Sequence, residues 1–177
     1  MNELKNTATA VGNYNNISTT LVSNIATVNI VDGLSLVKSA DKTNWNSGDL
    51  MYTITINNET ENNYEKPVIT DIIDTSLVTF IDGSVTIDGT KATSSEYKYD
   101  EQTHTLTVNL DTITPSSSLH LHFLLRKNHN KFFILKSNCT LECNDVELIE
   151  SNYVTVVSPE PRRRADEYWC GAPHWRD

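Results

Sequence analysis

Apolar residues recur at every second position through much of this sequence, and that period predicts β-strands rather than helices. Residues 50–57 place Leu50, Tyr52, Ile54 and Ile56 on one side, and the same period runs through 34–38, 105–110 and 119–123. Because successive side chains of a strand point to opposite faces, each segment would bury one face and expose the other. Turn signals such as Asn46-Ser47-Gly48 separate the segments. Many short strands joined by polar turns predict an all-β sandwich or barrel.

Length and charge limit what such a chain can do. Its 177 residues, 38% of them apolar, suffice for one ordinary domain with a sizeable core. The net charge of −9 disfavours nucleic acid and anionic membranes as partners, since both are themselves negatively charged. No apolar run is long enough to predict a membrane span. Residues 1–9 lack the apolar core of a secretory signal, which leaves a removed signal, another export route, or release by cell lysis.

One internal repeat divides the chain. Residues 4–9 read Leu-Lys-Asn-Thr-Ala-Thr and residues 22–28 read Val-Ser-Asn-Ile-Ala-Thr-Val. Near the end, residues 135–140 read Leu-Lys-Ser-Asn-Cys-Thr and residues 150–156 read Glu-Ser-Asn-Tyr-Val-Thr-Val. The chain therefore carries two copies of one closing hairpin around a single domain body, unless two hairpins of similar composition match by chance.

Between these copies the sequence resembles the DUF11 repeat domain, an Ig-like module of surface proteins in Gram-positive bacteria and archaea. The elements Leu-Val-Lys-Ser at 36–39, Gly-Asp at 48–49, Tyr-Thr-Ile-Thr-Ile-Asn at 52–57, Val-Ile-Thr-Asp at 68–71 and Phe-Ile-Asp-Gly-Ser at 80–84 occur in the family's order. The resemblance covers about residues 33–157 and implies an Ig-like antiparallel β-sandwich with a structural or adhesive role and no enzymatic activity. Residues 1–30 resemble the end of such a module and form an extra N-terminal β-hairpin.

A lone hairpin is only marginally stable in water, so residues 1–30 should dock somewhere. They either fold onto their own domain or act as donor to the next subunit of a filament by strand addition. Head-to-tail contacts that do not close produce fibres.

The resemblance also implies a candidate isopeptide bond, which related surface modules form between Lys and Asn with the help of an acid. The matching positions are Lys38, Asp71 and Asn138. Lys38 shares its face with Leu34 and Leu36, so its side chain should point inward. Asn138 falls on a polar face, so Asn6 is a rival acceptor that would make the bond intermolecular. The alternative is a salt-bridged lysine and a turn-capping aspartate.

Three cysteines, Cys139, Cys143 and Cys170, leave the disulfide pairing open. Cys139 and Cys143 lie about 13 Å apart along an extended strand, too far to bridge each other. Cys170 could pair with either one, within or between chains, and the alternative is three unreactive thiols.

Nothing else in the sequence predicts a catalytic or metal site. His120 and His122 share a strand face and His104 could join them, but strand histidines are more often solvent-facing. The carboxylates are scattered, without a catalytic pair or calcium-loop spacing. We therefore expect no enzymatic activity, no metal and no cofactor.

Residues 158–177 form a tail set off by Ser-Pro-Glu-Pro at 158–161. The tail uses arginine and tryptophan where the main body uses lysine, so it is either foreign to the domain or an interaction peptide.

Together these features predict an extracellular structural subunit of a self-assembling fibre on a bacterial cell or spore surface. Its partners would be other copies of itself or neighbouring surface domains, linked head to tail by the hairpin, with covalent cross-links as a further expectation. The alternative is a ligand-binding adhesin module of a longer cell-surface protein.

Overall fold

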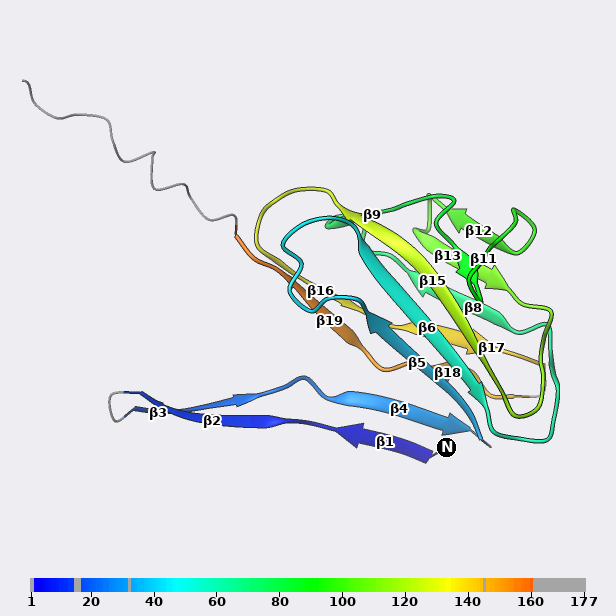
Figure 1. Cartoon of the computed structure of the whole chain (residues 1–177), viewed down its shortest axis with the longest axis horizontal. Helices are drawn as coiled ribbons and strands as arrows, with labels where there is room; N and C mark the ends of the chain where they lie inside the picture. Colours follow the sequence, from blue (N-terminus) through cyan, green and yellow to red (C-terminus); the bar gives the residue numbers. More distant parts are fainter. Residues whose placement is uncertain (1, 15–16, 32, 145, 161–177) are drawn as a thin grey trace, which may run out of the picture.

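The computed structural model describes residues 2–14, 17–31, 33–144 and 146–160, and this part of the chain consists of strands and turns without a helix. Two antiparallel sheets pack face to face and enclose one core (Figure 1). The structure confirms the predicted all-β, Ig-like sandwich with an added N-terminal hairpin. The alternating segments at 34–38, 50–57, 105–110 and 119–123 all lie in strands or at their ends. Cys170 and most of the tail lie outside the described residues.

The larger sheet carries the longest strands of the sandwich. Its order is β1-β4-β5-β6-β15-β10-β11, with β9 also paired to β15. The strands are β1 (Asn2–Asn6), β4 (Ala26–Val31), β5 (Leu34–Ala40), β6 (Leu50–Asn58), β9 (Val78–Phe80), β10 (Thr86–Ile87), β11 (Thr90–Lys91) and β15 (Ser117–Lys127). Asp88 and Gly89 join β10 to β11 with positive φ angles at both residues, the geometry of the two-residue hairpin turn that their sequence favours.

The second sheet has the order β12-β13-β8-β17-β18. Its strands are β8 (Val68–Ile72), β12 (Tyr97–Asp100), β13 (Thr105–Asn109), β17 (Cys139–Glu142) and β18 (Ile149–Glu150). Three further strand pairs complete the described part: β7 (Tyr64–Glu65) with β14 (Thr112–Ile113), β16 (Phe133–Ser137) with β19 (Val154–Ser158), and β2 (Thr9–Tyr14) with β3 (Ile17–Val22).

The end of the domain is one long hairpin, here called the closing hairpin (residues 133–158). Its two arms run β16–β17 and β18–β19, and both arms are interrupted at the same level, around Asn138 and Asn152. β17 joins the second sheet through β8, whereas β19 runs beside the start of the domain. There Trp45 donates a backbone hydrogen bond to Val157 and Val157 donates one to Thr43, in a parallel arrangement.

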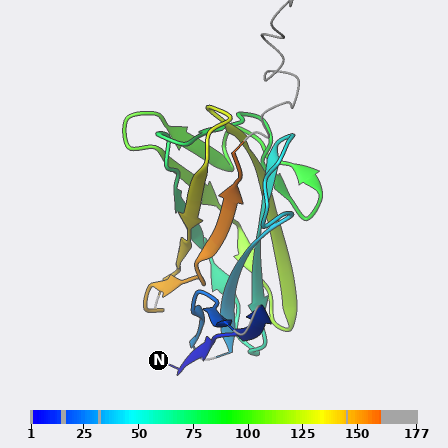
Figure 2. The same ribbon diagram turned by 90° about the vertical axis from the view of Figure 1, so that its left-hand side faces the viewer.

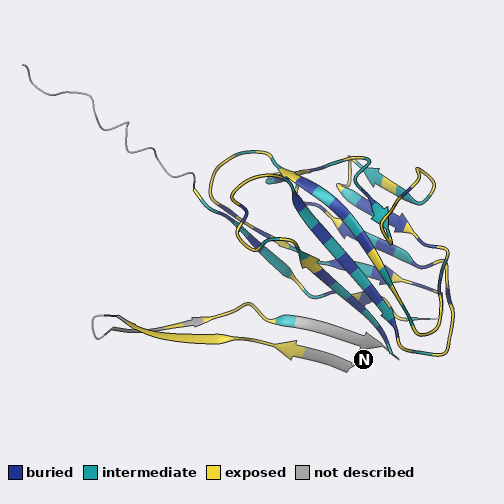
Figure 3. Cartoon of the chain, viewed as in Figure 1, coloured by how far each residue is buried: buried dark blue, intermediate teal, exposed yellow. Residues whose placement is uncertain are grey.

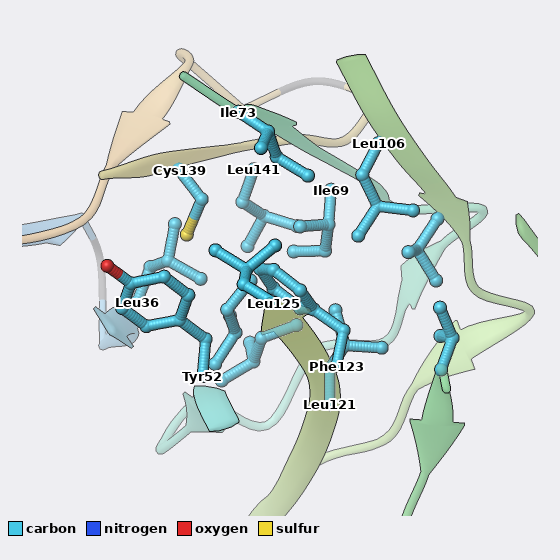
Figure 4. Packing of buried hydrophobic residues seen from close by; sticks show 14 of the residues in the cluster. Leu36, Tyr52, Ile69, Ile73, Leu106, Leu121, Phe123, Leu125, Cys139 and Leu141 are labelled. Carbon is cyan, nitrogen blue, oxygen red and sulfur yellow. The ribbon is translucent and has the colours of Figure 1, made fainter. Parts of the chain in front are cut away.

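The core lies between the two sheets, where the inward side of each alternating strand meets its counterpart. Figure 4 shows side chains from both sheets converging, among them Tyr52, Phe123, Leu106 and Cys139. The apolar alternation of the sequence corresponds to alternating burial in the structure. In β6, buried and half-buried residues alternate along the whole strand.

The N-terminal hairpin, here called the N-terminal arm (residues 2–31), stands apart from this core. It meets the sandwich through a short antiparallel contact in which Ile30 and Val31 of β4 pair with Ser35 and Leu34 of β5. The β2–β3 end projects away from the domain (Figures 1 and 2). The described side chains of the arm are almost all exposed, in contrast to the banded strands of the sandwich (Figure 3).

Candidate functional site

Lys38 is the most unusual residue of the core. It lies in β5 on the face that also carries Leu34 and Leu36, and it is only 1% exposed. A lysine buried this deeply requires partners for its amine, because a lone buried charge is strongly disfavoured.

Three oxygen atoms and the aromatic rings of Tyr52 and Phe123 surround the Lys38 amine. Nζ donates hydrogen bonds to the Asp71 carboxylate and to Ser137 Oγ, and a long one of 3.4 Å to the main-chain oxygen of Asn138. The amine also lies 4.3 Å from the centroid of the Tyr52 ring, a cation–π distance. The site therefore joins β5, β6 and β8 with the closing hairpin.

The interruption in the closing hairpin makes room for this cluster. Between β16 and β17 the chain leaves the regular ladder at Asn138, which turns its carbonyl toward Lys38. Asp71 reaches the same point from β8, directly opposite Cys139 in the strand register. Asp71 is 1% exposed, and its Oδ1 has no hydrogen-bond partner among the described residues.

Burial governs the ionisation of the groups around the amine. It raises the pKa of Asp71, although the adjacent Lys38 acts in the opposite direction. Burial likewise raises the pKa of the Cys139 thiol to about 12, with the Asp71 charge adding to the shift. The pKa of the Tyr52 hydroxyl is also raised, first by burial and then by Asp71. The site therefore favours uncharged side chains around one carboxyl–amine pair.

Asn152 completes the site from the other arm of the closing hairpin. Its Oδ1 accepts a 2.9 Å hydrogen bond from the Lys38 backbone N–H, and its Nδ2 donates a 2.9 Å hydrogen bond to the Lys38 carbonyl oxygen. One side-chain amide thus takes the place of a neighbouring strand along this edge of β5. Asn152 was not among the residues predicted for this site, although the repeated Ser-Asn pair marks it in the sequence.

Of the four residues predicted for an isopeptide bond, the structure brings the side chains of two into contact. Lys38 and Asp71 are in direct contact. Asn138 is adjacent, but it meets Nζ through its main-chain oxygen, and no described hydrogen bond joins Nζ to its side-chain amide. Asn6 is exposed at the end of β1, whereas the Lys38 side chain is fully buried.

The remaining candidates from the sequence are the cysteines and the strand histidines. Cys139 and Cys143 are both buried free thiols, and their predicted partner Cys170 is not among the described residues. His122 and His120 each contact a threonine of β6 through Nδ1, Thr53 at 2.9 Å and Thr55 at 3.2 Å. The part of the chain that the structure describes contains no cluster of three metal-ligating side chains. Within the same residues, no helix has the length and apolar character needed to cross a bilayer.

Comparison with known proteins places the fold but not a family. No protein-family model matches this sequence and no curated protein matches it, so the DUF11 resemblance remains a prediction.

Solved structures do share the fold. The BcpA major pilin subunit of Bacillus cereus is 15% identical with a TM-score of 0.53, over 87% of this chain and 48% of the pilin chain. The RrgA Jo.In complex is 15% identical with a TM-score of 0.56, over 75% of this chain and 84% of that one. The C-terminal domain of the Streptococcus pyogenes antigen I/II-family protein AspA is 15% identical with a TM-score of 0.52, over 86% and 54%. This chain thus spans about half the length of the pilin subunit, and at such identities the likeness shows the fold alone.

Proposed function

We propose that this chain is a non-enzymatic structural module of a bacterial surface fibre, joined head to tail to Ig-like neighbours through the N-terminal arm. The observation that carries the proposal is the arm itself: a two-stranded ribbon that leaves the sandwich with most of its described side chains in water. Such a ribbon gains little stability alone, so a neighbour that covers it would be strongly favoured. The fold shared with the BcpA pilin subunit supports this role.

The neighbour can be another copy, which makes the chain a self-assembling fibre subunit at a cell or spore surface. Electron microscopy and sedimentation velocity on the purified chain at rising concentration test this version. In this version the full chain would form filaments or head-to-tail oligomers, and these would be absent after deletion of residues 1–31. Filaments that form equally well without the arm would refute the proposed linkage.

The second candidate is a module of a longer adhesin, in which the neighbours are other domains of one surface protein. The likeness to AspA supports this version, because the matching structure is the C-terminal domain of a longer protein. A chain that stays monomeric at all concentrations would support this version.

Covalent locking of the Lys38 site is a separate part of the proposal. A raised Asp71 pKa suits a carboxyl that takes the Lys38 proton and polarises a nearby amide. The neutral amine would then attack the Asn138 side-chain carbonyl; a new C–N bond forms, the amide C–N bond breaks, and ammonia leaves. This step requires the Asn138 side chain to rotate toward Nζ, where its main-chain oxygen now points.

Intact-mass spectrometry of the purified chain tests the covalent bond. The bonded form is lighter than the sequence mass by one ammonia, and Lys38→Ala should restore the full mass. A wild-type chain of full mass would exclude an intramolecular bond and leave Lys38 as a buried ion-paired residue.

A further inference from the structure

The N-terminal arm and the closing hairpin are the same structure built twice. In the arm, β1 pairs with β4 so that Asn6 faces Ala26 and Asn2 faces Ile30. In the closing hairpin, β16 pairs with β19 so that Ser137 faces Val154 and Phe133 faces Ser158. The two ladders coincide residue for residue when Asn6 is matched to Ser137 and Ala26 to Val154.

The corner of the two hairpins repeats the same hydrogen bonds. In the closing hairpin, Cys139 N–H donates to Ser151 Oγ, Ser151 N–H donates to the Cys139 carbonyl, and Ser151 Oγ donates to the Asn152 carbonyl, at 3.0, 2.9 and 2.9 Å. In the arm, Ser23 makes the same three bonds.

Ala8 N–H donates to Ser23 Oγ at 2.8 Å, Ser23 N–H donates to the Ala8 carbonyl at 2.7 Å, and Ser23 Oγ donates to the Asn24 carbonyl at 2.8 Å. Asn24 thus stands where Asn152 stands. The repeat seen in the sequence is a repeat of backbone geometry down to individual donors and acceptors.

The contacts of the closing hairpin show which surface a hairpin of this shape covers. Asn152 binds the main chain of Lys38 on β5, Cys139 pairs with Asp71 on β8, and the inward residues Leu141 and Ile149 are fully buried. In the arm the matching positions carry Asn24, Ala8, Ala10 and Leu21, and the described residues among them, Asn24, Ala8 and Ala10, are exposed. The arm therefore has the form of a closing hairpin without its sandwich.

A second copy of this chain is a poor partner for the N-terminal arm. Its Lys38 edge is already covered by its own closing hairpin, which is tethered to it along the chain. Exchange would also replace Cys139 and Leu141 by the smaller Ala8 and Ala10, leaving space in a close-packed core. A core that suits the arm has larger side chains opposite these alanines.

We propose that the partner of the N-terminal arm is a different Ig-like sandwich that lacks a closing hairpin, and that Asn24 binds the main chain of its first strand as Asn152 binds Lys38. The proposal rests on the proposed role of the arm as the link between modules, and it names the chemistry of the neighbour: an open strand edge presenting one N–H and one C=O, beside a core that accepts small apolar residues.

A hairpin exchange within the full chain tests this. Residues 133–158 are replaced by a second copy of residues 2–30, and hydrogen exchange of the Lys38 amide is measured. Protection of that amide is expected in the exchanged protein. Asn24→Ala in the transplanted copy should reduce it by about tenfold, the reduction also expected for Asn152→Ala in the parent. The matched control, Asn13→Ala in the transplanted copy, should leave protection unchanged, because Asn13 lies beyond the corner.

Because Ala8 and Ala10 are too small to fill this core, a second exchanged protein is needed. In it the transplanted copy carries Asn2→Phe, Ala8→Cys and Ala10→Leu, which restore the side chains of the closing hairpin at these positions. A Lys38 amide that exchanges freely in both proteins, or that ignores Asn24→Ala, would overturn the inference. A full chain that polymerises by itself through the arm would also overturn it, because the partner would then be another copy, yet the proposed linking function would stand.

Discussion

At the scale of single residues, the Lys38–Asp71 pair is the feature with the largest energetic consequence. Both side chains are removed from water, so each depends on the other for compensation of its charge. Such a pair contributes little net stability compared with apolar residues, but removing one member leaves the other uncompensated. The pair is therefore better understood as part of a built site than as a source of stability.

Asp71→Ala should lower the free energy of unfolding by about 3–5 kcal/mol, since it leaves the Lys38 amine buried without its carboxylate. The double variant Lys38→Met with Asp71→Leu should recover most of that loss, because no charge remains to be compensated. Urea unfolding of the three proteins measures both effects. A double variant as unstable as Asp71→Ala would contradict this explanation.

Alkaline pH should weaken the fold through Cys139. Its folded pKa of about 12 lies above the ordinary value of 9.0, so the folded state resists ionisation that the unfolded state undergoes. The stabilising effect is complete below pH 9 and is lost at up to about 1.4 kcal/mol per pH unit as pH rises toward 12. Urea unfolding measured between pH 8 and pH 11, at ~1-unit steps, tests this. The free energy of unfolding should fall less with rising pH for Cys139→Ala than for the wild type. An equal decline would exclude Cys139 as a contributor.

At the scale of elements, sequence alternation predicted the strands well because each strand has one wet and one dry face, and that requirement is local. The inward direction of Lys38 was predictable for the same reason, from Leu34 and Leu36 on its face. Asn152 was not predictable, because its role depends on an interruption in the closing hairpin and on an edge of β5 more than a hundred positions away. The side-chain direction of Asn138 depends on that same interruption, so alternation alone could not place it.

The two matched asparagines should behave differently in the isolated chain. Asn152→Ala should lower the free energy of unfolding by about 1–3 kcal/mol, because the N–H and C=O of Lys38 lose their partner. Asn24→Ala should have no measurable effect, since the Asn24 side chain is exposed. Thermal and urea unfolding compare the two variants directly, and equal losses would show that the arm is part of the domain's own stability.

At the scale of the whole molecule, the core and the arm are separable. Every buried hydrophobic residue of the described chain lies between Leu34 and Val156. The sandwich fold of this region was predictable from the alternating apolar residues of the sequence. The position of the arm did not, because a repeated hairpin specifies its own shape and not the surface that it covers.

Deletion of residues 1–31 should therefore leave the unfolding midpoint of the domain within about 2 °C of the full chain, since no arm residue whose burial is described belongs to the core. Differential scanning calorimetry measures this. A drop of several degrees would mean that the arm packs onto its own domain in solution.

The parallel contact between Thr43, Trp45 and Val157 has a mechanical consequence. The chain enters the sandwich through β5 and leaves it through β19, and these two hydrogen bonds tie the segment that follows β5 to β19. Tension along the polypeptide would pull the parallel segments in opposite directions and load both bonds in shear. Bonds loaded in this way break together rather than one after another, so the domain is arranged to resist stretching from its two ends.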